Sequence, residues 1–142
     1  WLLDLNARAI FRTSQSAAKV MLKQGSGSII NMSSQMGHIG SPNRTLYCTT
    51  KHAVEGLTKA LGVELAPQGI RVNAVAPTFI DTPMTRPMFE NAEFKATVEN
   101  NIALGHVGKV EDVAAAVLFL ASPAAAMITG ESLKVDGGWT AW

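Results

Sequence analysis

Three residues that could transfer a proton lie close together between positions 34 and 51. Tyr47 and Lys51 are four residues apart in a segment with a helical pattern, so both side chains lie on one face, about one turn apart. A free tyrosine, with a pKa near ~10, is a poor acid or base at neutral pH, and a nearby lysine cation favours the phenolate. Ser34 adds a hydroxyl at the end of an apolar stretch. This set indicates an acid/base catalyst, although Y-x-x-x-K also occurs by chance in helices.

The segments that carry these residues alternate between helices and strands. Apolar residues at helical spacing predict helices, and runs rich in β-branched residues predict strands. The predicted elements are helices over 3–23, 45–66 and 111–122 and strands over 28–32, 70–76 and 132–135. Such alternation implies right-handed crossovers and a parallel sheet, so we expect an α/β fold with flanking helices. We expect the strand over 28–32 to be buried on both faces.

Ligands of parallel sheets bind beyond the carboxyl ends of the strands. Ser34 follows the first predicted strand, residues 77–82 follow the second and residues 136–138 follow the third. Residues 78–108 form a long segment that we interpret as a lid with short helices. Its large apolar side chains form either the wall of a pocket or part of the core: Phe79, Met84, Met88, Phe89 and Phe94.

The composition limits the possible partners. The formal net charge is +1, which favours neither nucleic acid nor an anionic membrane as the main partner. The longest apolar run, over 113–121, is too short to cross a bilayer. A single cysteine, Cys48, excludes an internal disulfide and favours a reducing compartment such as the cytoplasm. The three histidines lack the spacing of metal ligands, so we expect no metal site.

Four motifs taken together resemble the short-chain dehydrogenase/reductase family. They are N-x-S-S-x-x-G at 31–37, Y-x-x-x-K at 47–51, R-V-N-A-V-A-P at 71–77 and V-D-G-G at 135–138. The resemblance covers residues 1–142 as one domain and matches the C-terminal part of a doubly wound, Rossmann-type sheet. The family's glycine-rich dinucleotide loop and first strands have no counterpart here. Because the chain also opens inside a helix without a methionine, we expect it to be part of a longer protein whose N-terminal cofactor-binding half is absent.

The resemblance implies roles for four catalytic residues. Tyr47 would exchange a proton with the substrate oxygen, and Ser34, rather than Ser33, would orient and polarise that oxygen. Lys51 would favour the phenolate and bind the nicotinamide ribose. Asn6 would hold a water that relays protons from Lys51, or alternatively bond within its own helix.

The resemblance also implies a nicotinamide site after the second strand, at Pro77, Thr78, Ile80 and Thr82. The Ile80 backbone and the Thr82 hydroxyl would bind the carboxamide, and Thr82 would alternatively cap a lid helix. Thr78 stands where the family usually has glycine, so we expect the loop to sit slightly differently there.

These residues imply an NAD(P)-dependent oxidoreductase that interconverts a secondary alcohol and a ketone on a small-molecule substrate. The cofactor would be NAD or NADP, and the protein would form a homo-oligomer, a dimer or tetramer paired through its two long helices. The alternative is a non-catalytic fragment or assembly module that lacks the cofactor-binding half. Reductases of sugars, steroids and acyl thioesters share these motifs, so the motifs leave the substrate open.

Overall fold

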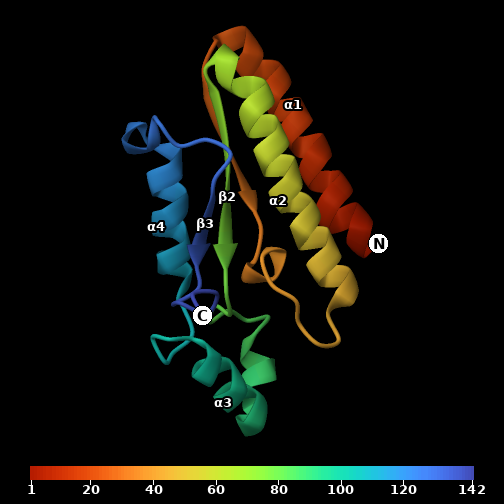
Figure 1. Cartoon of the computed structure of the whole chain (residues 1–142), viewed down its shortest axis with the longest axis vertical. Helices are drawn as coiled ribbons and strands as arrows, with labels where there is room; N and C mark the ends of the chain where they lie inside the picture. Colours follow the sequence, from red (N-terminus) through yellow and green to blue (C-terminus); the bar gives the residue numbers. More distant parts are fainter.

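The computed structural model describes residues 1–142 and contains a three-stranded parallel sheet. Its strands are β1 (Gly27–Met32), β2 (Ile70–Pro77) and β3 (Ser132–Val135), in the order β1-β2-β3 (Figure 1). In the register, Ile29 pairs with Val72 and Ala74 pairs with Ser132. The predicted parallel α/β architecture is confirmed.

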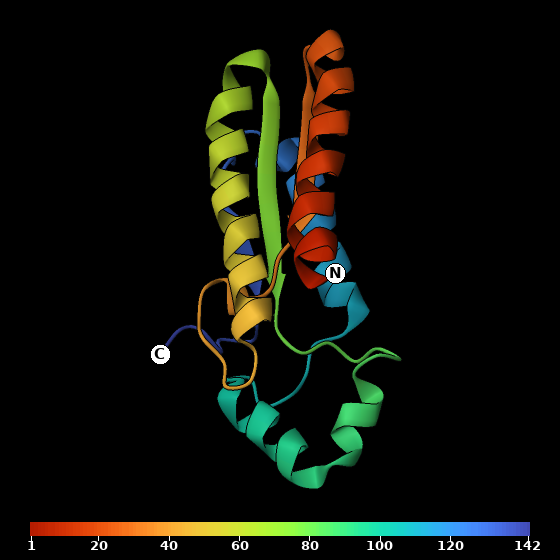
Figure 2. The same cartoon turned by 90° about the vertical axis from the view of Figure 1, so that its right-hand side faces the viewer.

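Helices cover both faces of this sheet. The long helices α1 (Ala9–Gln24) and α2 (Thr45–Leu65) lie side by side on one face, and α4 (Val110–Ala121) lies on the other (Figures 1 and 2). Successive strand residues point to opposite faces, so β2 contributes Val72 to a core cluster with α1 and α2, and Val75 to a cluster with α4. The core therefore has two layers, one on each side of β2.

The expectation that the first strand is buried on both faces is wrong. Within β1 only Ile29 and Asn31 are buried, and Met32 is 45% exposed. The reason is the position of β1 at the edge of the sheet, where it pairs only with β2 and has no strand on its other side.

The predicted boundaries differ from the structure by one or two residues. The first helix begins with a π-helical turn (Asp4–Arg8), and α2 continues into a 3-10 turn (Ala66–Gln68). Strand β2 includes Pro77, which pairs with Val135, whereas the sequence predicted an end at residue 76. Proline is tolerated here because β1 pairs with β2 only as far as Val75, so the missing N–H of Pro77 removes no hydrogen bond between these strands.

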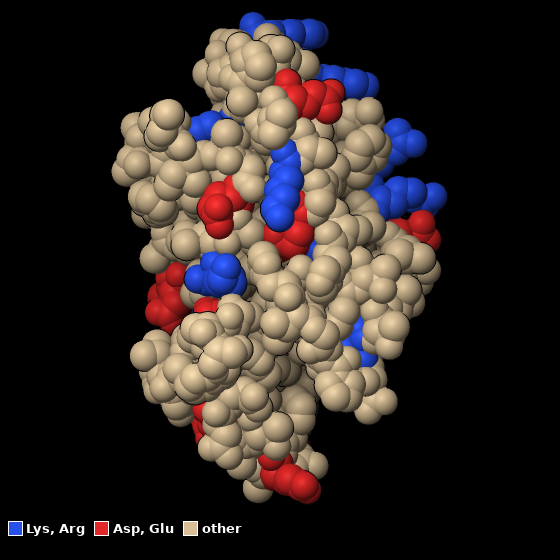
Figure 3. Space-filling view, viewed as in Figure 1, with Lys and Arg blue, Asp and Glu red and all other residues tan.

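The lid lies beyond the carboxyl ends of the strands, at the bottom of Figure 1. It contains a 3-10 helix (Arg86–Glu90) and α3 (Ala92–Asn101), as predicted. Figure 3 shows acidic and basic side chains dispersed over this face of the molecule, with mostly uncharged surface over the lid. None of the helices combines the length and apolar character that a bilayer crossing requires.

Candidate active site

Helix α2 places Tyr47 and Lys51 on the same face, as predicted. Lys51 is only 7% exposed, and its ammonium nitrogen lies 5.7 Å from the centroid of the Tyr47 ring. The ammonium donates a hydrogen bond to the Met32 carbonyl, 3.0 Å away, which is its single acceptor in the chain. Burial lowers the pKa of Lys51, and the carboxylate of Glu55, one turn further on, partly opposes this shift.

Ser34 lies immediately beyond β1, where the chain leaves the sheet. Its hydroxyl accepts a hydrogen bond from the Met36 backbone, 3.2 Å away, and so caps a short 3-10 turn (Gln35–Gly37). The neighbouring hydroxyl of Ser33 points elsewhere and donates to the Glu55 carboxylate. Ser34 and Tyr47 line one cavity, whereas Ser33 does not, which is the arrangement that the motif spacing predicted.

Asn6 lies in the π-helical turn at the start of the first helix. Its side-chain amide donates to the Thr50 hydroxyl, 3.2 Å away, and that hydroxyl donates to the Tyr47 carbonyl, 2.8 Å away. The amide therefore crosses to α2, beside Lys51, instead of bonding within its own helix. Its role as a water relay stays a prediction.

The cavity that contains Ser34 and Tyr47 has a volume of about 290 Å³. Its remaining lining comes from the loop after β1, the start of α2 and the lid: Gln35, Met36, Arg44, Thr78, Phe79, Ile80, Thr82, Met84, Thr85 and Met88. Three of the five predicted lid side chains therefore line it. Phe94 lines a neighbouring cavity instead, and Phe89 packs against Phe79 and Phe94, with ring centroids 6.1 and 6.3 Å away.

Thr78 carries a buried hydroxyl that has no hydrogen-bond partner in the protein. The residue follows β2 directly, and its backbone N–H donates to the Val135 carbonyl, 3.1 Å away. Thr78 lines the cavity of Ser34 and Tyr47 and also a second cavity beside Asp136. An orphaned buried hydroxyl is unfavourable, so its position fits a group that a ligand would bind.

The other residues predicted to bind a nicotinamide lie in the turn beyond Thr78. The Thr82 hydroxyl lies 3.1 Å from that of Thr85, and the Thr85 hydroxyl also donates to the Ile80 carbonyl, 2.5 Å away. Thr85, which the sequence did not single out, thus fixes the turn. Thr78, Ile80 and Thr82 line the cavity, whereas Pro77, at the end of β2, does not.

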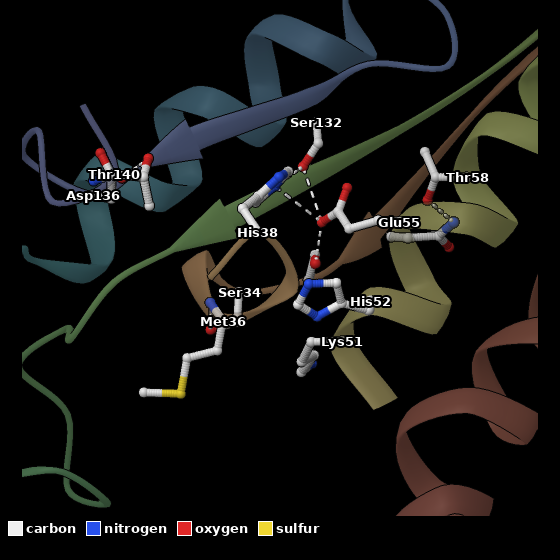
Figure 4. A network of polar contacts seen from close by, with 12 residues as sticks. Ser34, Met36, His38, Lys51, His52, Glu55, Thr58, Ser132, Asp136 and Thr140 are labelled. Carbon is white, nitrogen blue, oxygen red and sulfur yellow. Dashed lines mark hydrogen bonds and ion pairs between the residues drawn. The ribbon is translucent and has the colours of Figure 1, made fainter. Parts of the chain in front are cut away.

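A buried polar network beneath the Ser33–Ser34 segment was also missed at the sequence level. His38 and Ser132 point toward the carboxylate of Glu55, which they meet at 3.3 and 3.0 Å (Figure 4). Ser33 bonds to the same carboxylate oxygen. The network ties the segment before Ser34 to α2 and β3, and only the position of Glu55 four residues after Lys51 could have indicated it.

Asp136, directly after β3, holds the last turn of the chain. Burial alone would raise the pKa of its carboxyl, but the Thr140 hydroxyl, the Gly138 and Thr140 backbone N–H groups and Lys134 outweigh burial and lower the pKa. The Thr140 hydroxyl lies 2.7 Å from Asp136 Oδ2. No three His, Cys, Asp or Glu side chains gather in a metal-binding arrangement anywhere in residues 1–142.

Comparison with known proteins decides the family. Residues 2–140 match the model of a family described as enoyl-(acyl carrier protein) reductase. The chain belongs to the short-chain dehydrogenase/reductase family. This membership explains why four individually short motifs occur together in one chain.

Members of this family with curated names are similar over nearly the whole chain. A 3-oxoacyl-[acyl-carrier-protein] reductase of Thermotoga maritima is 44% identical over 136 residues, which are 96% of this chain and 54% of the relative. A 3alpha-hydroxysteroid dehydrogenase of Mediterraneibacter gnavus is 48% identical, with the same shares covered. The chain spans about half the length of these relatives.

Solved structures of the family have the same fold. A gluconate 5-dehydrogenase from Burkholderia cenocepacia, in complex with NADP and tartrate, aligns with a TM-score of 0.93 and 34% identity. The alignment covers 96% of this chain and 54% of that structure. The Rossmann-type fold that the motifs implied is thereby confirmed.

Proposed function

We propose that the protein is, or is part of, an NAD(P)-dependent oxidoreductase that interconverts a secondary alcohol and a ketone. One observation carries this proposal. The hydroxyl-bearing side chains of Ser34 and Tyr47 line a single cavity, and the buried ammonium of Lys51 lies 5.7 Å from the ring of Tyr47. The similar gluconate 5-dehydrogenase is in complex with NADP, which supports the choice of cofactor.

The residues of the cavity suit the handling of one oxygen atom and its proton. Ser34 and Tyr47 would hold the substrate oxygen by hydrogen bonds, and Tyr47 would accept its proton during oxidation or donate one during reduction. The ammonium of Lys51, 5.7 Å from the phenol ring, would stabilise negative charge on the Tyr47 oxygen when the proton has left it. The Met32 carbonyl fixes the ammonium in place. Asn6, bound to Thr50 beside Lys51, would position a water that returns the proton to solvent.

The cofactor would be NAD or NADP, which supplies or accepts a hydride when bound. Lys51 would bind its ribose, because two of the three ammonium donors have no acceptor in the chain. The orphaned hydroxyl of Thr78 lies beside the same cavity and would bind the nicotinamide end together with Pro77, the Ile80 backbone and Thr82.

Replacing Tyr47 with phenylalanine tests the proposed role of the phenol. Tyr47→Phe removes one oxygen and keeps the ring, so we expect turnover to fall by about two to four orders of magnitude while NAD(P)H still binds. The matched control is Thr49→Val, which removes a hydroxyl from the exposed side of α2, where it bonds to the Thr45 carbonyl. Near-normal turnover in Tyr47→Phe would show that the assigned role is wrong.

The second candidate is a non-catalytic assembly module. It would associate through the long helices α1 and α2, which lie side by side on one face of the sheet (Figures 1 and 2). Titration of NADH and NADPH into the protein discriminates between the two candidates. Tight binding of either nucleotide rejects the module, whereas self-association without nucleotide binding supports it.

We also propose that the protein assembles as a homodimer or homotetramer in the cytoplasm. The support is the family's usual pairing through its two long helices, here α1 and α2, and the single buried cysteine. Light scattering that gives the mass of one subunit would contradict the assembly.

A further inference from the structure

Arg44 brings a positive charge to the proposed active site. It directly precedes α2, three residues before Tyr47, and lines both the 290 Å³ cavity and a neighbouring cavity of about 630 Å³. Its guanidinium forms no ion pair, unlike that of Arg86 on the lid, which Asp81 binds at 2.7 Å. No acidic residue lines either cavity, so the charge of Arg44 is free for a ligand.

Gln35 supplies a second, independent sign of a ligand. Its side chain is 1% exposed and lines both cavities that contain Arg44. Neither its amide nitrogen nor its amide oxygen has a hydrogen-bond partner in the protein. A buried amide without partners is unfavourable, so both atoms would gain hydrogen bonds if the side chain turned toward a ligand in either cavity.

The start of α2 reinforces the positive potential at this point. The helix has no side-chain cap at its N-terminus and no acidic residue in its first turn. Its first N–H groups therefore keep their partial positive charge, which favours an anion beside Arg44.

We propose that the substrate is a short hydroxy acid or keto acid whose carboxylate binds Arg44. Its chain hydroxyls contact Gln35, and its reacting oxygen lies between Ser34 and Tyr47. Arg44 and Tyr47 line the same 290 Å³ cavity, so a short substrate can place its carboxylate at one and its reacting oxygen at the other. This assignment rests on the proposed oxidoreductase function and adds the substrate class.

Calorimetric titration of matched acids and alcohols into the full protein tests the proposal, with and without NADPH. The probes are gluconate against glucitol and 3-hydroxybutyrate against 1,3-butanediol, which differ in one carboxylate. We expect at least one acid to bind about tenfold more tightly than its alcohol, a difference of about 1.4 kcal/mol. Arg44→Met should abolish this preference, so that each acid and its matched alcohol bind with equal affinity. Arg12→Met on α1, which removes the same charge away from both cavities, should keep it.

Two outcomes overturn the proposal: failure of both acids to bind more tightly than their alcohols, and retention of the preference in Arg44→Met. The titration does not depend on turnover, so it separates this proposal from the proposed function. Acid binding through Arg44 without hydride transfer would contradict the oxidoreductase function alone. Turnover of alcohols without any acid preference would contradict the assignment of Arg44 alone.

Discussion

The buried hydroxyl of Thr78 predicts that one substitution changes stability and cofactor binding in opposite directions. Its oxygen has no partner in the protein, although the Thr78 backbone N–H is bonded to Val135. Thr78→Val replaces the hydroxyl with a methyl group of similar size and keeps a β-branched side chain after β2. We therefore expect the free protein to become more stable and its binding of NAD(P)H to become weaker.

The size of the effect follows from the cost of an unpaired polar group. A buried hydroxyl without a partner costs about 1–3 kcal/mol, so Thr78→Val should raise the free energy of unfolding by about 1 kcal/mol or more. For a chain of 142 residues, 1 kcal/mol corresponds to a shift of about 3 °C in the unfolding temperature. Saturating NAD(P)H should raise the unfolding temperature less in the variant than in the wild type, since one ligand contact is lost.

Thr58 provides the matched control for this experiment. Its hydroxyl is equally buried, but it accepts a hydrogen bond from the Asn31 amide, 3.0 Å away. Thr58→Val leaves that amide unpaired and should lower the free energy of unfolding by about 1–3 kcal/mol. Thermal unfolding of both variants, followed by circular dichroism, makes the comparison. A lower unfolding temperature for Thr78→Val than for the wild type would refute the reasoning.

Two further predictions concern stability. Gly62→Ala should lower the free energy of unfolding, measured in urea, by about 1–3 kcal/mol, because the new Cβ would lie 2.7 Å from the Gly130 backbone. Gly56→Ala, on the open side of α2, should instead raise it by up to about 1 kcal/mol. Light scattering should give both variants the same particle mass, so that their stabilities can be compared. Equal effects of the two substitutions would then contradict the close contact between Gly62 and Gly130. The lowered pKa of Asp136 means that its ionised form stabilises the fold above about pH 4, and that this contribution is lost as the pH falls through the folded-state pKa. Asp136→Asn should therefore unfold with a free energy about 1 kcal/mol lower than that of the wild type at pH 7. The urea midpoints of the two proteins should converge as the pH is lowered toward 2. A difference between the midpoints that stays constant with pH would contradict this prediction.

The sequence by itself determined the features that depend on local spacing. Tyr47 and Lys51 share a face because an α-helix returns to the same side after four residues, whatever surrounds it. The alternation of helices and strands likewise determined a parallel sheet and placed Ser34 and Thr78 at its carboxyl edge. Family motifs then assigned chemistry to these positions before any contact between them was known.

Only the tertiary structure decided the features that depend on which distant segments meet. Glu55 meets Ser132, 77 residues away, because α2 packs against β2 and the register of β3 places Ser132 beside Ala74 of β2. Gln35 and Thr78 each have buried polar atoms without a hydrogen-bond partner. Several elements surround these atoms, so no local sequence pattern predicts that they are unpaired. The exposure of Met32 follows from the order of the strands in the sheet, which hydrophobic patterning does not specify.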